Sequence, residues 1–93
     1  MIFSWLAKKI PQCSYVKKRR DGEILIVCAE NLSIHYFNST AAFFIELANG
    51  KNSVGEIKNK FLERYDVEEN ELEKDFVGMI RDLQWKKILI LED

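Results

Sequence analysis

The chain has few of the residues on which chemistry usually depends: one histidine, His35, one proline and four glycines among 93 residues. Nothing marks an acid or a nucleophile beside the histidine, so no set of base, orienting group and nucleophile can be assembled, and we expect no enzyme. The glycines form no phosphate-binding loop, because Gly50 is explained as a helix end and Gly55 as a capping-box position. We therefore expect no cofactor and favour binding over catalysis.

Long apolar runs are missing as well. The start of the chain is apolar, but no charge precedes it and the run is too short for a signal peptide or a membrane span. We interpret residues 1–11 as an apolar arm, packed on the core or on a partner, before a domain over residues 12–93. The arm owes its apolar character to Ile2, Phe3, Trp5 and Leu6. It could also reach a neighbour, so we expect a monomer or a homodimer, with no membrane partner.

Cysteine is limited to Cys13 and Cys28. Their spacing is not that of metal ligands. Because the sequence shows no secretory signal, we expect the protein to reside in the reducing cytoplasm. A turn near Asp21-Gly22 would bring the two thiols opposite each other across a hairpin, or displaced by one cross-strand residue pair. Two buried thiols are favoured, with a disulfide or a shared metal as alternatives.

Charge is balanced over the whole chain but uneven along it. The net charge of −1 argues against a nucleic-acid coat or a membrane-surface binder. Residues 8–20 nevertheless carry six basic residues and no acid, whereas residues 63–75 carry seven acids and two basic residues. The apolar content of 47% is that of one folded domain.

The first half of the chain predicts three strands. Residues 15–18 and 23–29 flank Arg20-Asp21-Gly22, a strong hairpin signal. The run 24–27 is apolar on both faces, which is typical of a central strand covered on at least part of both sides. Residues 32–37 alternate: Leu32, Ile34 and Tyr36 point one way and Ser33, His35 and Phe37 the other. In a simple meander this third strand keeps a free edge.

Three helices follow. The first is predicted over residues 39–49, capped by Asn38 or Ser39 and ended by Gly50. The second opens with the capping box Ser53 to Glu56, and the third begins near Glu69 or Asn70. The buried stripe of the second helix is expected to comprise Val54, Ile57, Phe61, Leu62 and Tyr65. That of the third is expected to comprise Leu72, Phe76, Met79 and Leu83. Residues 88–91 form a last extended run.

The third helix is asymmetric about its stripe. Val77 and Ile80 extend the apolar surface to one side, with Glu73 and Gln84 beside them. Such a flank could line a groove, or it could merely widen the core contact. Periodicity fixes faces but not neighbours, so both interpretations stay open.

The ordered series of these motifs resembles the PqqD-like proteins, which recognise ribosomally made precursor peptides. The resemblance runs over about residues 12–91 and is carried by residues 37–41, 49–51, 53–57, 61–62, 65–67, 73–76 and Leu83. It implies a winged-helix-like α+β fold, a three-stranded antiparallel β-meander followed by a three-helix bundle. It also implies a non-catalytic adaptor that presents a peptide leader to a modifying enzyme, often a radical S-adenosylmethionine protein.

The family mechanism implies a binding site on this chain. The leader would add as a strand to the free edge of the third strand and lie against the third helix. The implied edge is Leu32, Ser33, Ile34, His35, Tyr36 and Phe37, and the implied helix wall is Glu73, Val77, Ile80, Arg81 and Gln84.

Two alternatives share the fold. Winged-helix regulators bind DNA through their third helix, but here that helix carries an excess of acids, which phosphates would repel. We therefore expect no nucleic-acid partner and keep a winged-helix DNA-binding regulator as the alternative. An interaction domain without a peptide ligand also remains open.

Overall fold

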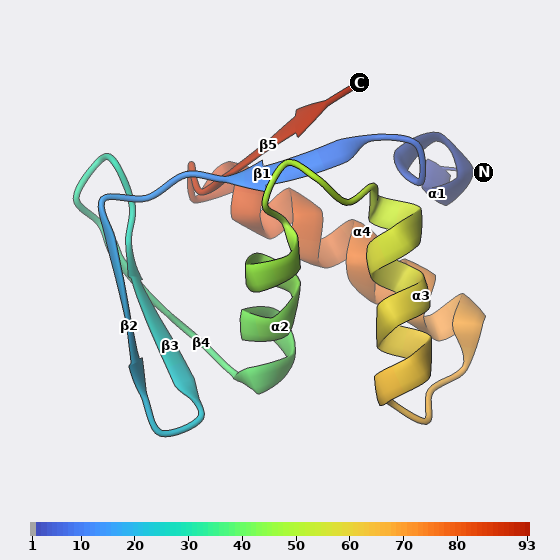
Figure 1. The fold of residues 1–93 in the computed structure, drawn as a ribbon. Coiled ribbons are helices and arrows are strands. Elements are labelled where there is room, and N and C mark those ends of the chain that lie inside the picture. The colour runs from blue at the N-terminus through green and yellow to red at the C-terminus, as the bar shows by residue number, and fades with distance from the viewer. Residues whose placement is uncertain (1) are drawn as a thin grey trace.

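The chain folds into two small antiparallel sheets and four helices, as the computed structural model of residues 2–93 shows (Figure 1). The predicted α+β class, with a three-stranded meander followed by three helices, is confirmed. None of the helices in residues 2–93 is long and apolar enough to span a bilayer. In chain order the elements are α1 (Ile2–Leu6), β1 (Ile10–Cys13), β2 (Lys17–Asp21), β3 (Ile24–Cys28), β4 (Ile34–Phe37), α2 (Ser39–Leu47), α3 (Val54–Arg64), α4 (Glu69–Trp85) and β5 (Leu89–Glu92).

The main sheet is the predicted meander, in the order β2-β3-β4. Asp21 pairs with Ile24, so the turn consists of Gly22, whose φ is +63°, and the residue after it. This register places Cys28 opposite Lys17. The expectation that Cys28 faces Cys13 is therefore wrong, because Cys13 belongs to β1, which ends before this hairpin begins and lies in another sheet. Both thiols are free.

A second sheet was not predicted. β1 pairs antiparallel with β5, and Cys13 lies opposite Leu89. The sequence indicated no strand over residues 10–13, which fell across the end of the arm and the start of the domain, because their partner strand lies at the other end of the chain. β1 thus crosses the predicted boundary between arm and domain. In the rest of the arm Phe3 and Leu6 are buried in the core, while Met1 lies outside the described residues.

The helix boundaries follow the predicted caps closely. The Asn38 side chain accepts the Ala41 amide at 2.9 Å and begins α2. Ser53 and Glu56 form the full capping box of α3, with bonds of 2.7 and 3.1 Å. At its other end α2 stops at Leu47, two residues earlier than predicted, with Ala48 as its C-cap. Gly50 is left-handed, with φ +83°, but it lies beyond the helix end, and its amide donates to the Pro11 carbonyl at 3.0 Å.

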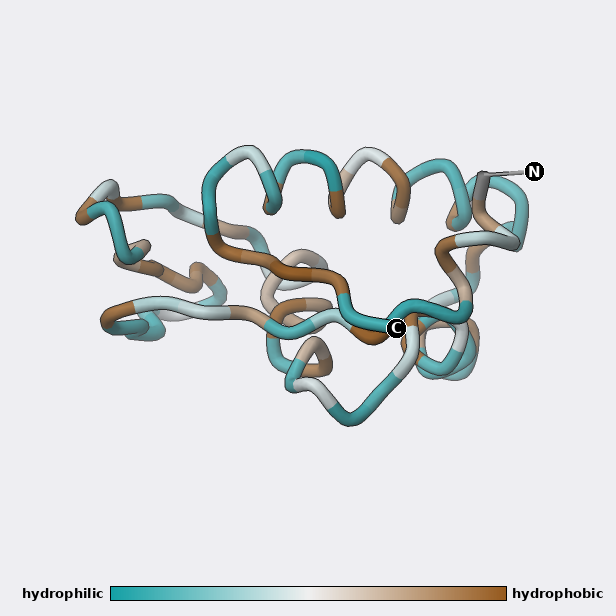
Figure 2. Tube along the Cα trace, turned by 90° about the horizontal axis from the view of Figure 1, so that it is seen from above, coloured by the Kyte–Doolittle hydropathy of each residue, from teal (hydrophilic) through white to brown (hydrophobic). Residues whose placement is uncertain are grey.

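The core lies between the helices and one face of the main sheet. Phe76 of α4 meets Phe44 of α2 and Phe61 of α3, with ring centroids 5.1 and 4.9 Å apart. Figure 2 shows apolar positions of α4 on the turns that face the rest of the molecule. One detail differs from the expected stripe: Ile80 is fully buried and Met79 only partly, so the buried face of α4 is rotated toward Ile80.

Candidate functional site

The two edges of the main sheet differ in chemistry. β2, at one edge, is charged at every position from Lys17 to Asp21 and exposed along its whole length. β4, at the other edge, reads Ile-His-Tyr-Phe and carries neither an acid, a lysine, an arginine nor a proline. Charged edge residues discourage the addition of another strand. β2 therefore presents a charged edge that discourages strand addition, whereas β4 carries none of these charges.

The hydrogen-bonding groups of β4 can be assigned to one side or the other. The Ala29 amide donates to the Ser33 carbonyl at 2.9 Å, so these residues form a hydrogen-bonded pair. Such pairs alternate with non-hydrogen-bonded ones along an antiparallel ladder. Ile34 and Tyr36, opposite Cys28 and Ile26, are therefore non-hydrogen-bonded positions. Their N–H and C=O groups point away from β3, toward an edge that pairs with no other strand in residues 2–93.

Side chains on β4 alternate as the sequence predicted. Ile34 and Tyr36 are 58% and 70% exposed on one face, whereas Phe37 is buried on the other. His35 lies on the inner face, where its Nε2 is 2.9 Å from the Ser33 hydroxyl, and that hydroxyl donates to the Asn31 side chain at 2.6 Å. The inner face of the strand thus carries a short polar chain that fixes the histidine ring.

Leu32 stands just before the strand, not within it. Its amide donates to the Ala29 carbonyl at 2.8 Å, and its φ is +69°. This is the left-handed position of a three-residue hairpin loop, which normally favours glycine. Leu32 is also 71% exposed. A large apolar side chain in an unfavourable backbone conformation, open to solvent beside the free edge, points to a role in contacts.

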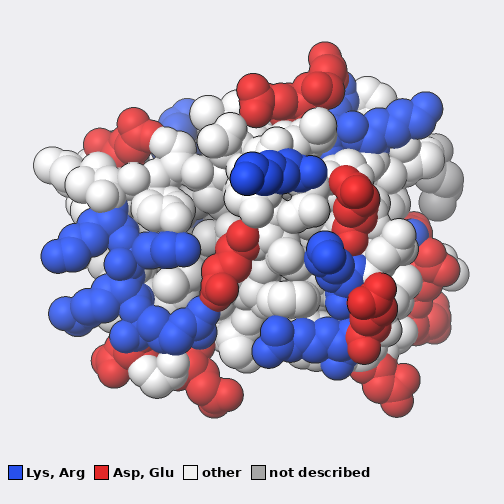
Figure 3. All heavy atoms as spheres, viewed as in Figure 1, with Lys and Arg blue, Asp and Glu red and all other residues white. Residues whose placement is uncertain are grey.

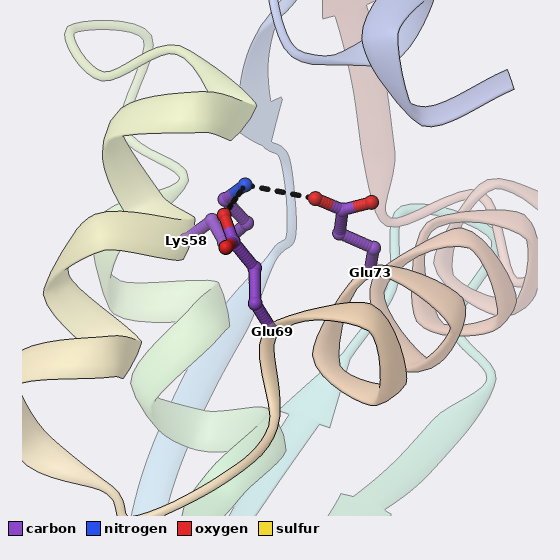
Figure 4. Close-up of polar contacts among 3 residues, drawn as sticks. All are labelled: Lys58, Glu69 and Glu73. Atoms are coloured by element: carbon purple, nitrogen blue, oxygen red, sulfur yellow. Dashed lines mark hydrogen bonds and ion pairs between the residues drawn. The ribbon is translucent and has the colours of Figure 1, made fainter. Parts of the chain in front are cut away.

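The predicted helix wall divides into two parts. At its N-terminal end Glu73 accepts from the Lys58 ammonium at 2.9 Å, and Glu69 accepts from the same ammonium at 2.6 Å (Figure 4). The Phe3 ring centroid lies 5.0 Å from this ammonium. These two bonds raise the pKa of Lys58, the bond to Glu69 most. Glu73 is thus engaged in holding α3 and α1 on α4.

Two apolar residues of the same flank belong to the core to different degrees. Ile80 is 2% exposed, so of the two interpretations left open, the structure shows the widened core contact for this residue. Val77 is half-buried against the core. Arg81, further round the helix, is exposed.

The C-terminal end of the flank is open. Gln84 lines a hollow of about 560 Å³ between the end of α4, β5 and the loop that leads into β4. Sequence reasoning missed the other lining residues, because the pairing of β1 with β5 was not predicted. They are Ser14, Glu30, Lys87, Leu89, Ile90 and Leu91. The structure therefore brings Gln84 near the start of the candidate edge and leaves Glu73 at the far end of the helix.

The chain is thus a small α+β domain whose main sheet has one charged edge, β2, and one uncharged edge, β4. Residues 23–89 match the sequence model of PqqD, described as coenzyme PQQ synthesis protein D. Since the match spans more than half of the chain, the chain belongs to the PqqD family, a family of coenzyme PQQ biosynthesis proteins. A search of the curated proteins and a search of the solved structures gave no significant match.

Proposed function

We propose that this protein is a non-catalytic adaptor that binds the leader of a ribosomally made precursor peptide by β-strand addition to β4. It presents the peptide to a modifying enzyme of the radical S-adenosylmethionine class. The observation that carries the proposal is the contrast between the two edges, with charge at every position of β2 and no acid, lysine, arginine or proline on β4. Membership of the PqqD family supports the same class of function.

In this proposal the backbone groups of β4 provide affinity for the peptide, and the side chains around β4 select among peptide sequences. A peptide strand would exchange hydrogen bonds with the outward N–H and C=O groups of Ile34 and Tyr36, which demand no particular peptide sequence. Alternate peptide side chains would then lie on the two faces of the extended sheet. We expect Leu32, Gln84 and the exposed Arg81 to discriminate among these side chains.

The test is an amide NMR titration with the leader of the short peptide encoded beside the gene. We expect shifts at residues 32–37 and near Gln84, with slower amide exchange at Ile34 and Tyr36. A peptide of the same composition in scrambled order is the control, and amides of α3 provide an internal reference. Absence of shifts in a protein shown to be folded and monomeric would overturn the proposal.

DNA binding is the competing outcome, and the charge of α4 opposes it. Glu69, Glu71, Asp75 and Asp82 are exposed along this helix, and phosphates would meet them directly if the helix entered a groove. The same preparation can be titrated with duplex DNA at two salt concentrations. Salt-dependent affinity without any response to the leader would favour a regulator over an adaptor.

A further inference from the structure

The main sheet has an apolar outer face, the face turned away from the helices. The register of β3 and β4 sets Ile26 beside Tyr36 and Cys28 beside Ile34 on this face, with Ile24 at its end. Ile24 is 40% exposed, and Ile34 and Tyr36 more so. Helices in residues 2–93 lie on the other side of the sheet (Figure 1), where Leu25, Val27 and Phe37 are buried.

The outer face of β3 is covered only in part. The run 24–27 is apolar on both faces and predicts a strand covered on at least part of both sides. Within the described residues, however, only the inner positions Leu25 and Val27 are buried, while Ile24 is exposed and Ile26 half-buried. Contiguous exposed apolar residues mark an interaction surface. A partner is therefore needed to complete the burial that the sequence of β3 prepares.

Charge at the margin of the outer face indicates the chemistry of that partner. Alternation along β2 divides its basic cluster, visible at the left of Figure 3, between the two faces of the sheet. On the inner side Arg20 pairs with Glu46 of α2, and the Lys18 ammonium lies 5.5 Å from the Tyr15 ring centroid. On the outer side Lys17 and Arg19 lie opposite Cys28 and Ile26.

The two outward cations form no ion pairs within residues 2–93, although Asp21, opposite Ile24, lies on the same face. Neither Lys17 nor Arg19 forms an ion pair with any residue in the described part of the chain. Together with Lys18, Ile26, Cys28 and Ile34 they line a shallow hollow of about 190 Å³. An apolar hollow with two unpaired cations on one side is complementary to an apolar side chain flanked by carboxylates.

We propose that the outer face of the main sheet docks a protein surface that presents apolar side chains flanked by carboxylates, and that this surface belongs to the peptide-modifying enzyme. The inference rests on the proposed adaptor function and adds the place of contact. A leader strand on β4 would extend the same face, since its alternate side chains would stand beside Ile34 and Tyr36. The enzyme would then contact adaptor and peptide together, so peptide and enzyme strengthen each other's binding.

The experiment measures binding of the enzyme encoded beside the gene to immobilised adaptor, with and without the leader. The test variant is Lys17→Glu/Arg19→Glu, which reverses both outward cations without touching β4. Its matched control is Lys8→Glu/Lys60→Glu, with the same change of net charge at two exposed positions away from the outer face. Ile24→Ser, on the central strand, tests the apolar part of the face separately.

We expect the test variant to lower the association rate by about tenfold or more and to flatten its salt dependence, while the control variant behaves as wild type. Leader affinity, measured alone, should stay unchanged in all variants. Enzyme binding that is equal in wild type, test variant and Ile24→Ser would overturn the docking surface while leaving the adaptor function intact. A dimer of the adaptor that the test variant dissociates would also overturn it, because a second copy would then cover the face. Failure of wild type to bind the leader at all would instead refute the proposed function.

Discussion

Replacing Ile34 by proline tests strand addition at the level of one hydrogen bond. The Ile34 amide points away from β3, so proline at this first position of an edge strand removes no bond of the sheet. In the complex it would delete one donor and leave a peptide carbonyl unpaired. An unsatisfied group of this kind costs about 1–3 kcal/mol, which corresponds to a rise in Kd of about 5- to 150-fold.

Calorimetric titration of the leader gives the Kd, and thermal unfolding gives the stability of each variant. Ile34→Ala is the matched control, because it loses the same exposed side chain but keeps the amide. His35→Pro provides the opposite case: its amide faces Val27 within the sheet, so the variant should lose stability. An Ile34→Pro variant with native stability and the leader affinity of Ile34→Ala would refute the assignment of β4 as the binding edge.

Three further predictions concern single side chains. Leu32→Gly relieves the left-handed backbone strain, so we expect the free energy of unfolding to rise by up to about 1 kcal/mol. The affinity for the leader should fall. A variant that binds the leader as tightly as wild type would exclude a contact role for this residue. Burial raises the pKa of the Cys13 thiol to about 12. At pH 8 this thiol should therefore react with a disulfide reagent at least about a hundredfold more slowly in the native protein than in urea. Equal rates would show that the Cys13 site is open to solvent. Lys58→Met should lower the free energy of unfolding by about 1 kcal/mol at neutral pH. Because the pKa of Lys58 is raised in the folded state by its bonds to Glu69 and Glu73, this contribution is present at pH 7 and is lost as the pH rises above the ordinary pKa of 10.5. Chemical denaturation of both proteins at pH 7 and pH 11 measures that difference, and an undiminished gap at pH 11 would contradict the ion-pair explanation.

Much of the candidate site follows from patterns within a few residues. The alternation over residues 32–37 predicts which side chains of β4 face solvent, because successive strand residues point to opposite faces. The turn at Gly22 joins neighbouring strands, so their order needs no distant information. What the sequence could not provide is the set of neighbours around the edge. The hollow beside Gln84 contains β5, whose pairing with β1 joins the two ends of the chain.

The sequence by itself determined the meander and the three longer helices, two of them with their N-caps, because Asn38, Ser53 and Glu56 act on backbone groups three residues away. It did not indicate the helix α1, which was expected only as part of an apolar arm. Tertiary structure alone decided the rest, since packing depends on surfaces that are distant along the chain. It buried Ile80 in place of Met79, engaged Glu73 with Lys58 of another helix, and left the outer face of β3 only partly buried. Periodicity can predict an apolar face of a strand or helix, but only the folded structure shows whether other residues of the chain cover that face.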